Sequence, residues 1–454
     1  MNGVFGIINT LGGTVSYATL SGMAATVGSM PHDVADHRVY GAAGLGVCRR
    51  WLTEPVNCSV EGPAGSNVIF IGDIRLDNRD ELSARLGLGD CTPVPDDGQL
   101  IVAAYAKWGA AMPDKLLGDF AFALWDSAKS ELFMACDYLA TCSLYYRRLG
   151  DLFVFANSIS PLVSEPFSSP ALDVEATAAL LRDGEHYHSR RTLLAGVNQL
   201  PPGSSLTLRG SAERIDQYWS INDERSQFSG TAQEAVETLG RLLSSAVRSR
   251  VQTSYPVAAH LSGGLDSSAI IAQAAPLLGG QLRGYSWMSV PSEQQEREDP
   301  EWSTGQLLAS TYQLPLDYCA LSAESMLQLL TAHDLALGDT ADLWSEHILR
   351  GKVVDDGART LLSGWGGDQF ITHYGNSLYA QRLLSGDALA VVRELRAPSL
   401  RRSLANLRNF LLLPLMGSLG KRVMPGYLGF ASEEVKQLAA TGEPLTTYSG
   451  VFVE

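Results

Sequence analysis

The stretch Leu261-Ser262-Gly263-Gly264-Leu265-Asp266-Ser267-Ser268 decides the fold of the second half of this 454-residue chain. Residues 256–261 form an apolar run that predicts a strand, and residues 267–275 have the apolar spacing of a helix. The stretch is therefore a glycine-rich turn between a strand and a helix. A helix begins with unpaired N–H groups and the positive end of its dipole, and glycines let the backbone approach an anion closely. We expect a phosphate-binding loop here.

The side chains of this loop indicate how a nucleotide would be held. Ser262, Ser267 and Ser268 can donate hydroxyl hydrogen bonds to phosphate oxygens. Asp266 cannot usefully contact phosphate because both are negative, so we expect it to hold Mg²⁺ instead. No Gly-Lys-Ser/Thr motif follows the glycines, which argues against a kinase-like γ-phosphate site. The plain structural alternative is a turn whose Asp and Ser only cap a helix.

A second glycine-rich segment, residues 361–369, has the sequence Leu-Leu-Ser-Gly-Trp-Gly-Gly-Asp-Gln. It ends a strand predicted at residues 359–362, and its Asp368 is a second candidate metal ligand. Another predicted strand, residues 282–290, contains Ser286 and Trp287, which either contact the nucleotide or belong to an ordinary core strand. Because the carboxyl ends of parallel strands meet at one edge of a sheet, we expect these segments to lie together.

The order of the predicted elements separates two halves. Up to about residue 210 short strands outnumber helices, as in antiparallel sheets. From residue 231 strands alternate with helices, which implies a parallel sheet with helices on both faces. Residues 210–230 are polar, and we expect a linker there. In the first half we predict strands at residues 68–72, 120–125, 131–136, 152–156 and 205–208 and helices at 80–86 and 98–108; in the second half we predict further helices at 234–247 and 302–312.

These motifs together resemble a known family. The first loop resembles the pyrophosphate-binding loop of the N-type ATP pyrophosphatases, and residues 361–369 resemble the "LSGxGxDE" segment of asparagine synthetases. Residues 72–82, 116–126 and 200–203 resemble segments of class II glutamine amidotransferases. The resemblance covers roughly residues 1–375. It implies an α/β protein, with an Ntn-hydrolase-like αββα sandwich at 1–210 followed by a parallel-sheet ATP-pyrophosphatase (adenine nucleotide α-hydrolase-like) domain at 231–454.

The resemblance also implies roles for individual residues. In the family ATP is split between its α and β phosphates, a carboxylate becomes an acyl-adenylate, and an amine then displaces AMP. ATP and Mg²⁺ are therefore the expected cofactors, with Asp266 and Asp368 as metal ligands and with Asp266, Asp368 and Trp365 as the catalytic set. The implied nucleotide-binding residues are Leu261, Ser262, Gly263, Gly264, Asp266, Ser267, Ser268, Ser286, Trp287, Ser363 and Gly364.

The first half departs from the glutaminase pattern where the chemistry would occur. In the family a nucleophilic Cys follows the initiator Met, but here that position is Asn2, and an amide side chain is no nucleophile. The glutamine-binding stretch is replaced by Arg-Leu-Asp-Asn-Arg-Asp-Glu-Leu at residues 75–82. We do not expect Cys48 or Cys136 to act instead. The first half is therefore expected to be a scaffold or a docking surface that makes no ammonia.

Without ammonia the amine must come from elsewhere, and residue 365 helps to choose its source. Asparagine synthetases carry Glu at this position and β-lactam synthetases carry Tyr, whereas Trp365 cannot act as a base but can pack against a substrate. Lasso-peptide cyclases also lack the Cys, and they join an Asp or Glu side chain of a peptide to its own N-terminal amine. We therefore favour a lasso-type macrolactam synthetase, which implies a peptide substrate and, as partners, a leader-binding protein and a protease. The alternatives are a β-lactam-like or other small-molecule amide ligase, and an inactive homologue that binds ATP or peptide. For Trp365 itself, the plain alternative is that it only packs the loop.

The end of the chain matches the family least. Family members place an "RxPFLD"-like stretch and a catalytic Lys beyond the second loop, and no clear match precedes Glu454. Lys421 and Lys436 are candidates by position only, for a charge that would offset the developing charge on phosphorus.

The overall composition argues against several classes of protein. A formal net charge of −15 is unfavourable for a nucleic-acid binder. The six cysteines form no CxxC pair, which is typical of a reducing compartment rather than of a zinc site or a disulfide framework. The N-terminus lacks the pattern of a signal peptide, and the apolar run at residues 410–420 is too short to span a bilayer. We expect a cytoplasmic protein without membrane insertion.

Overall fold

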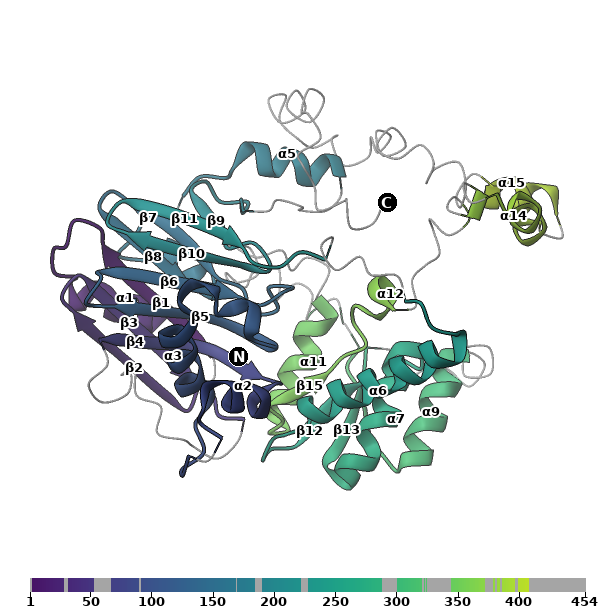
Figure 1. Cartoon of the computed structure of the whole chain (residues 1–454). Coiled ribbons are helices and arrows are strands. Elements are labelled where there is room, and N and C mark those ends of the chain that lie inside the picture. The colour runs from purple at the N-terminus through teal and green to yellow at the C-terminus, as the bar shows by residue number, and fades with distance from the viewer. Residues whose placement is uncertain are drawn as a thin grey trace. The chain divides into compact units, whose positions relative to one another are not determined.

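The structure is a computed structural model, and it describes residues 2–27, 32–52, 67–89, 91–168, 170–183, 190–221, 228–287, 300–320, 322, 324, 344–371, 379, 382–383, 386–396 and 399–407. The chain divides into two compact units (Figure 1). The described residues of the first unit end at 221, and those of the second begin at 228. The apolar run at 410–420, Lys421 and Lys436 lie outside the described residues.

The first unit contains two antiparallel sheets. One has the strand order β2-β3-β1-β8-β7-β9, and the other has the order β11-β10-β6-β5-β4. The strands of the first sheet are β1 (Gly3–Asn9), β2 (Val34–Tyr40), β3 (Ala43–Arg49), β7 (Tyr145–Leu149), β8 (Leu152–Ala156) and β9 (Val197–Gln199). Those of the second sheet are β4 (Val68–Leu76), β5 (Gly118–Asp126), β6 (Glu131–Cys136), β10 (Ser204–Arg209) and β11 (Ala212–Gln217).

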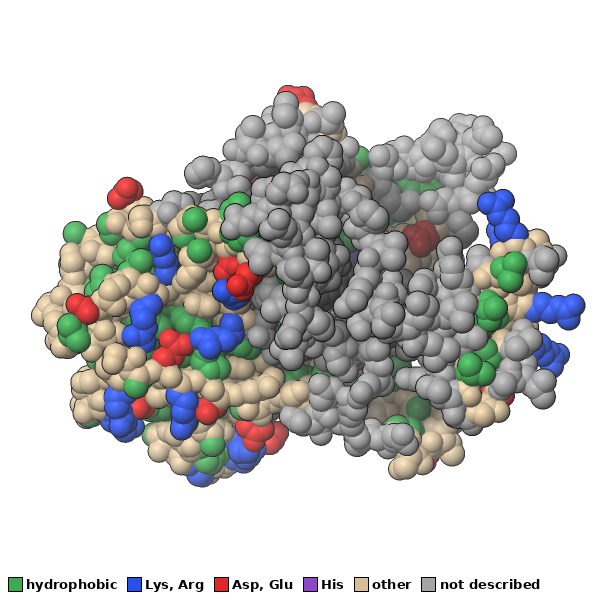
Figure 2. Space-filling view, turned by 90° about the horizontal axis from the view of Figure 1, so that it is seen from above, with side chains coloured by type: hydrophobic (Ala, Val, Ile, Leu, Met, Phe, Trp, Pro, Cys, Tyr) green, Lys and Arg blue, Asp and Glu red, His purple; other side chains and the backbone are tan. Residues whose placement is uncertain are grey.

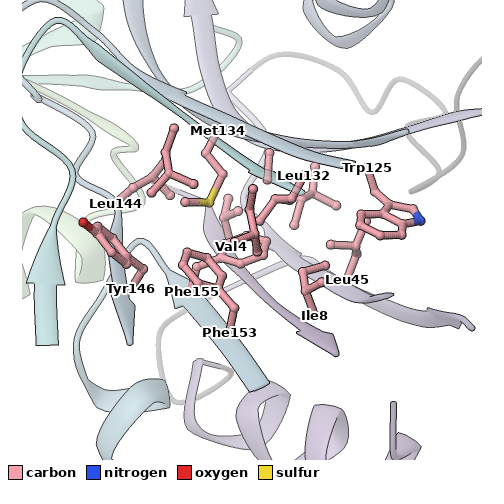
Figure 3. Packing of buried hydrophobic residues seen from close by; sticks show 14 of the residues in the cluster. Val4, Ile8, Leu45, Trp125, Leu132, Met134, Leu144, Tyr146, Phe153 and Phe155 are labelled. Carbon is pink, nitrogen blue, oxygen red and sulfur yellow. The ribbon is translucent and has the colours of Figure 1, made fainter. Parts of the chain in front are cut away.

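Alternating side chains place one apolar core between the sheets and another outside them. In β5, Ala123 and Trp125 belong to the cluster between the sheets, which also contains Val4 and Phe155 (Figure 3). Phe122, on the opposite face of β5, packs in a second cluster with α2 (Arg79–Leu86) and α3 (Asp97–Trp108). On the outer face of the other sheet, α1 (Tyr17–Val27) contacts β1 and β3 and lies beside α4 (Ser160–Val163). The layers are those of the expected αββα sandwich. This unit also contains α5 (Val174–Asp183) and the short 3₁₀ turns η1 (Gly109–Ala111) and η2 (Pro113–Lys115).

The predicted linker at residues 210–230 is wrong in its first part. Ala212–Gln217 forms β11, which pairs along its whole length with β10. β11 is an edge strand with several exposed residues, and it therefore carries polar residues such as Glu213 and Asp216. This polar composition explains why the segment resembles a linker.

The second unit is built on a parallel sheet with the order β14-β13-β12-β15. Its strands are β12 (Val257–His260), β13 (Leu282–Ser286), β14 (Leu316–Tyr318) and β15 (Thr360–Leu362). Its helices are α6 (Ala232–Arg250), α7 (Leu265–Leu278), η3 (Gly279–Gln281), α9 (Pro300–Tyr312), α11 (Trp344–Asp355), α12 (Gly367–Phe370), α14 (Ala388–Leu395) and α15 (Leu400–Leu407). The predicted strand at residues 282–290 ends earlier, at Ser286.

Helices cover both faces of this sheet, as the alternation of elements predicted. Val257 and Ala259 of β12 pack in one cluster with residues of α6, α7 and α9. Ala258, which points to the other face, packs with Leu349 and Val353 of α11. Since successive residues of a strand alternate between faces, His260 lies on the α11 side.

Two surface properties bear on the expectations from composition. Among the described residues, no helix combines the length and the apolar character needed to cross a bilayer. On the face of the first unit seen in Figure 2, Lys and Arg side chains lie among Asp and Glu side chains. Arg209 and Glu131 of the same unit form an ion pair at 2.8 Å. Charge of either sign is therefore interspersed on that face rather than gathered in one block.

Candidate active site

The first glycine-rich loop, residues 261–264, continues directly from β12 and leads into α7. Leu261 donates its backbone N–H to the carbonyl of Tyr285 at 2.8 Å, which holds the loop against the end of β13. Gly263 has a φ of +84°, and a Cβ at this position would lie 1.8 Å from the carbonyl oxygen of Glu301. Both its backbone conformation and this contact with α9 therefore require glycine.

Hydroxyl groups fix the shape of this loop. The Ser262 Oγ lies 2.9 Å from the Ser267 Oγ and accepts the Gly264 N–H at 3.2 Å. The Ser268 hydroxyl donates to the Gly264 carbonyl at 2.7 Å. Gly264 is the N-cap of α7 and has no side chain with which to cap the helix. The start of α7 thus keeps the character of an anion site, while the three hydroxyls support the turn from within.

The second loop, residues 363–366, packs directly on the first. β15 lies beside β12 in the sheet, so both loops leave the same edge. A Cβ at Gly364 would lie 2.7 Å from the Ser267 backbone nitrogen, and a Cβ at Gly367 would lie 2.2 Å from the Asp266 Cγ. The structure therefore brings the two predicted loops together, with the Asp266 carboxyl group against the backbone of the second loop.

The two candidate metal ligands have different surroundings. Asp266 is half-buried in the first turn of α7, and Asp368 is exposed in α12, next to the glycine that Asp266 touches. Within the described ranges, no group of three or more His, Cys, Asp or Glu could hold a metal ion. Two carboxylates suit Mg²⁺, which prefers oxygen ligands and takes its other ligands from water and substrate phosphates. The residues therefore fit a Mg²⁺ ion that is held jointly with a nucleotide.

Trp365 projects from the second loop into solvent. Its side chain is 79% exposed, although its backbone N–H is held by the Ser363 Oγ at 3.1 Å. Leu265 in the first loop and Ile371 after α12 are also large and exposed. Trp365 is therefore a largely exposed aromatic residue, three residues before Asp368 in the chain.

Ser286 and Trp287 occupy the end of β13. Ser286 is buried, and its carbonyl accepts the Cys319 N–H at 2.7 Å, so this residue is part of the core of the sheet. The Trp287 ring centroid lies 4.7 Å from that of His260. The Trp287 indole nitrogen is buried and has no hydrogen-bond partner within the part of the chain that the structure describes.

The structure adds His260 and Glu346, which the sequence reasoning missed. His260 Nδ1 lies 3.0 Å from the Ser363 Oγ, and His260 Nε2 lies 3.1 Å from the Glu346 Oε2. The second contact is close enough for an ion pair, although it is not aligned as a hydrogen bond. Burial raises the pKa of Glu346, but His260 and Arg350 outweigh this effect and hold that pKa below its ordinary value. A His in the otherwise apolar run before the first loop was the one available signal, and nothing in the sequence pointed to Glu346.

In the first unit, hydrogen bonds to the surrounding backbone and side chains hold Asn2, at the position where the family resemblance implies a nucleophilic Cys. Its N–H donates to Asp73 Oδ1 at 2.9 Å, its side-chain oxygen accepts the Arg50 N–H at 2.8 Å, and its carbonyl accepts from Asn157 Nδ2 at 2.5 Å. Asn2 thus has a structural role, which agrees with its lack of a nucleophilic group.

Neither Cys48 nor Cys136 has the character of a nucleophile. Cys136 is buried, its Sγ lies 3.1 Å from the Pro201 carbonyl oxygen, and burial raises its pKa to about 12. Burial also raises the pKa of Cys48. Both side chains are therefore thiols rather than thiolates near neutral pH, in agreement with the expectation from sequence.

Comparison with known families agrees with this architecture. Residues 60–219 match the glutamine amidotransferase domain, and residues 238–447 match the asparagine synthase domain. The chain belongs to the asparagine synthetase-like family, with the two domains in the order that the fold shows.

Individual relatives are distant and longer than this chain. The "Asparagine synthetase [glutamine-hydrolyzing] 3" of Bacillus subtilis is 29% identical over 49% of this chain and 36% of its own length. The "Asparagine synthetase [glutamine-hydrolyzing] 2" of the same organism is 24% identical over 83% of this chain and 53% of its own length. The "Amidase chyE" of Penicillium rubens is 32% identical over 47% of this chain and 31% of its own length. The chain thus spans about a third to a half of the length of these curated relatives.

Proposed function

We propose that this chain is an ATP-dependent amide ligase that activates a carboxylate as an acyl-adenylate and lets an amine attack it. The observation that carries the proposal is the contact of the two loops, in which the Asp266 carboxyl group lies against Gly367, one residue before Asp368. Two acidic side chains at the meeting point of two glycine-rich strand ends suit a bound Mg²⁺–pyrophosphate group. The family to which the chain belongs supports the same reaction class.

Each part of the site would have a separate task. The start of α7 and the loop at residues 261–264 would bind the phosphates through backbone N–H groups. Asp266 and Asp368 would hold Mg²⁺, which offsets the negative charge of the leaving pyrophosphate. The close contact between the loops would keep both carboxylates in position before the substrate binds. Binding and orientation can supply several kcal/mol to such a reaction, about 7–11 kcal/mol in the best intramolecular cases.

The amine would come from the substrate itself. Asn2 offers no nucleophile for glutamine, and its side chain is engaged with the Arg50 backbone. A substrate that carries both the carboxylate and the amine needs no ammonia. A peptide that closes a macrolactam between an Asp or Glu side chain and its own N-terminal amine meets this requirement, as in the lasso-peptide cyclases.

The exposed face of Trp365 favours a large substrate over a small one. An indole that is not covered by the protein can pack against a peptide chain beside the reacting groups. A lasso-type macrolactam synthetase would also need a leader-binding protein and a protease that prepare the peptide. It would work in the cytoplasm, where ATP is available.

The test measures AMP and pyrophosphate release from Mg-ATP with linear peptides that have a free N-terminus and an internal Asp or Glu. Intact-mass analysis of the peptide is expected to show the loss of one water. The matched variants are Asp266→Asn, which is expected to stop turnover, and Asp317→Asn, which changes an acid that pairs with Arg283 at 3.2 Å. Turnover with small β-amino acids but not with peptides would favour a small-molecule ligase. A lack of AMP release with every carboxylate tested would refute the proposal and favour an inactive ATP-binding or peptide-binding homologue.

A further inference from the structure

A buried polar pair, His260 and Glu346, supports the second loop, and the proposed binding of Mg²⁺ and nucleotide does not require this pair. His260 is 6% exposed and Glu346 is 5% exposed. Nearby residues of the same strand and helix, such as Ala258 and Leu349, belong to one apolar cluster. Burying a polar pair costs free energy, and apolar side chains of similar size would fill the same space at lower cost. A specific task for this pair would explain its presence.

The contacts of His260 point to that task. The ring reaches three other segments: its Nδ1 meets the Ser363 Oγ, its Nε2 faces Glu346 in α11, and its face lies near Trp287. The Ser363 Oγ in turn accepts the Trp365 N–H at 3.1 Å. The Ser363 hydroxyl is therefore held from two sides, once by the imidazole and once by the backbone of its own loop.

Glu346 completes the arrangement from the far side of the ring. Its other carboxylate oxygen pairs with Arg350 Nε at 2.7 Å, one turn further along α11. Glu346 is therefore anchored in the helix independently of His260, and it limits the rotation of the imidazole.

We propose that His260 is a positioning residue for the second loop, which it holds through the Ser363 hydroxyl while Glu346 orients its ring. The loop that Ser363 begins contains Gly364, and it leads to Gly367 and Asp368. Release of Ser363 would let this backbone move away from Asp266. The importance of this for turnover rests on the proposed function, whereas the effect on the loop does not.

A Ser-His-Glu set also suggests a hydrolase triad, but the geometry argues against one. Ser363 contacts Nδ1 and Glu346 faces Nε2, the reverse of the Ser-His-Asp triad of serine proteases, and the His260 ring itself is buried. The Ser363 Oγ already accepts a backbone N–H, so this hydroxyl is committed to the loop.

Two substitutions of the same residue separate the positioning role from simple packing. The side-chain amide of Asn ends where Nδ1 lies, so His260→Asn can keep the contact with Ser363. Gln reaches the place of Nε2, so His260→Gln keeps the contact with Glu346 and loses the one with Ser363. Ser363→Ala removes the same contact from the other side. Tyr285→Phe is the control, because it removes a 2.8 Å hydrogen bond to Asp356, beyond the end of α11, that does not involve the loop.

Hydrogen–deuterium exchange on the full chain, without nucleotide, provides the measurement. For peptides that cover residues 363–368, His260→Gln and Ser363→Ala are expected to exchange about fivefold faster than the wild type, the factor for one ordinary hydrogen bond. His260→Asn and Tyr285→Phe are expected to exchange at nearly the wild-type rate. Equal changes in the Asn and Gln variants, or no change in the Gln and Ala variants, would overturn the proposal.

The same samples with Mg-ATP separate this inference from the proposed function. Protection of residues 261–268 and 363–368 by Mg-ATP in the wild type would support nucleotide binding. Its absence would overturn the proposed function, while the comparison of variants without nucleotide would still decide the role of His260.

Discussion

Gly367→Ala is the sharpest test of the contact between the two loops. Gly367 begins α12, and its backbone conformation is one that alanine can adopt. A methyl group there would lie 2.2 Å from the Asp266 Cγ and 2.4 Å from its Oδ2. Alanine is otherwise a better helix former than glycine. Any harm must therefore come from the collision with the Asp266 carboxyl group.

The size of the effect follows from these distances. Ordinary contact begins at 3.4 Å, so the carboxyl group or the loop must shift by about 1.2 Å to relieve the 2.2 Å approach. A misplacement of about 1 Å can cost a factor on the order of 100 in turnover. We therefore expect Gly367→Ala to lower the rate of AMP release about a hundredfold while the protein stays folded.

The assay compares AMP release and thermal unfolding of the variant with those of the wild type and of Gly351→Ala. Gly351 lies in α11, and a Cβ built there meets no other atom within 4 Å among the residues that the structure describes. This control is expected to keep full turnover and to gain roughly 0.5–1 kcal/mol of stability from helix propensity.

Wild-type turnover in a folded Gly367→Ala variant would refute the reasoning. It would mean that the position of Asp266 relative to the second loop does not matter for the reaction. A loss of turnover in both Gly367→Ala and Gly351→Ala would also contradict it, because the effect could then not be attributed to the contact between Gly367 and Asp266.

Four other predictions use separate parts of the chain. Asp368→Asn is expected to abolish Mg²⁺-dependent AMP release, and activity near that of the wild type would remove Asp368 from the site. Trp365→Ala is expected to raise the peptide KM roughly tenfold, about 1.4 kcal/mol, with unchanged ATP affinity; an unchanged KM would show that the indole does not contact substrate. Asn2→Ala is expected to keep turnover but to lower the free energy of unfolding by about 1 kcal/mol, because the Arg50 N–H loses its acceptor; loss of turnover in the folded variant would reveal a functional role. Burial raises the pKa of Asp73 despite the hydrogen bond from Asn2, so its ionised form costs stability above the ordinary carboxyl pKa. Asp73→Asn is therefore expected to be more stable than the wild type at neutral pH. This difference in stability shrinks as the pH falls through the raised pKa of folded Asp73, and it disappears below the pKa of Asp73 in the unfolded chain. Thermal melts that show the same difference at every pH would contradict this.

Complete burial made some strands predictable, although the buried strands β1 and β3, which each contain glycines, were not predicted. Phe120–Trp125 is apolar throughout because β5 packs on a cluster at each of its faces, and such a run stands out without any neighbours. β2 and β11 were not predicted. Both are edge strands with exposed or half-exposed residues, so their polar composition resembles that of loops.

The same distinction applies to the site. The two loops were predictable because each carries its glycines and its Asp within a few residues, and the parallel sheet brings their strand ends together. The contacts of His260 with Ser363 and Glu346 were not predictable, because His260 and Ser363 lie 103 residues apart and Glu346 belongs to a helix between them in the sequence. A contact between single side chains of distant segments leaves no periodic pattern in the sequence.

The two units differ in how their key residues are held. Asn2 stands where the family resemblance implies a nucleophilic Cys, and it forms three hydrogen bonds with Asp73, Arg50 and Asn157. In the second unit, the contacts at Gly364 and Gly367 leave no room for even one methyl group. Such close contact has little value for a scaffold, since a looser packing of the two loops would fold as well. It has value where two carboxylates must be held in place, and the ligase half is therefore where we expect the activity of this chain.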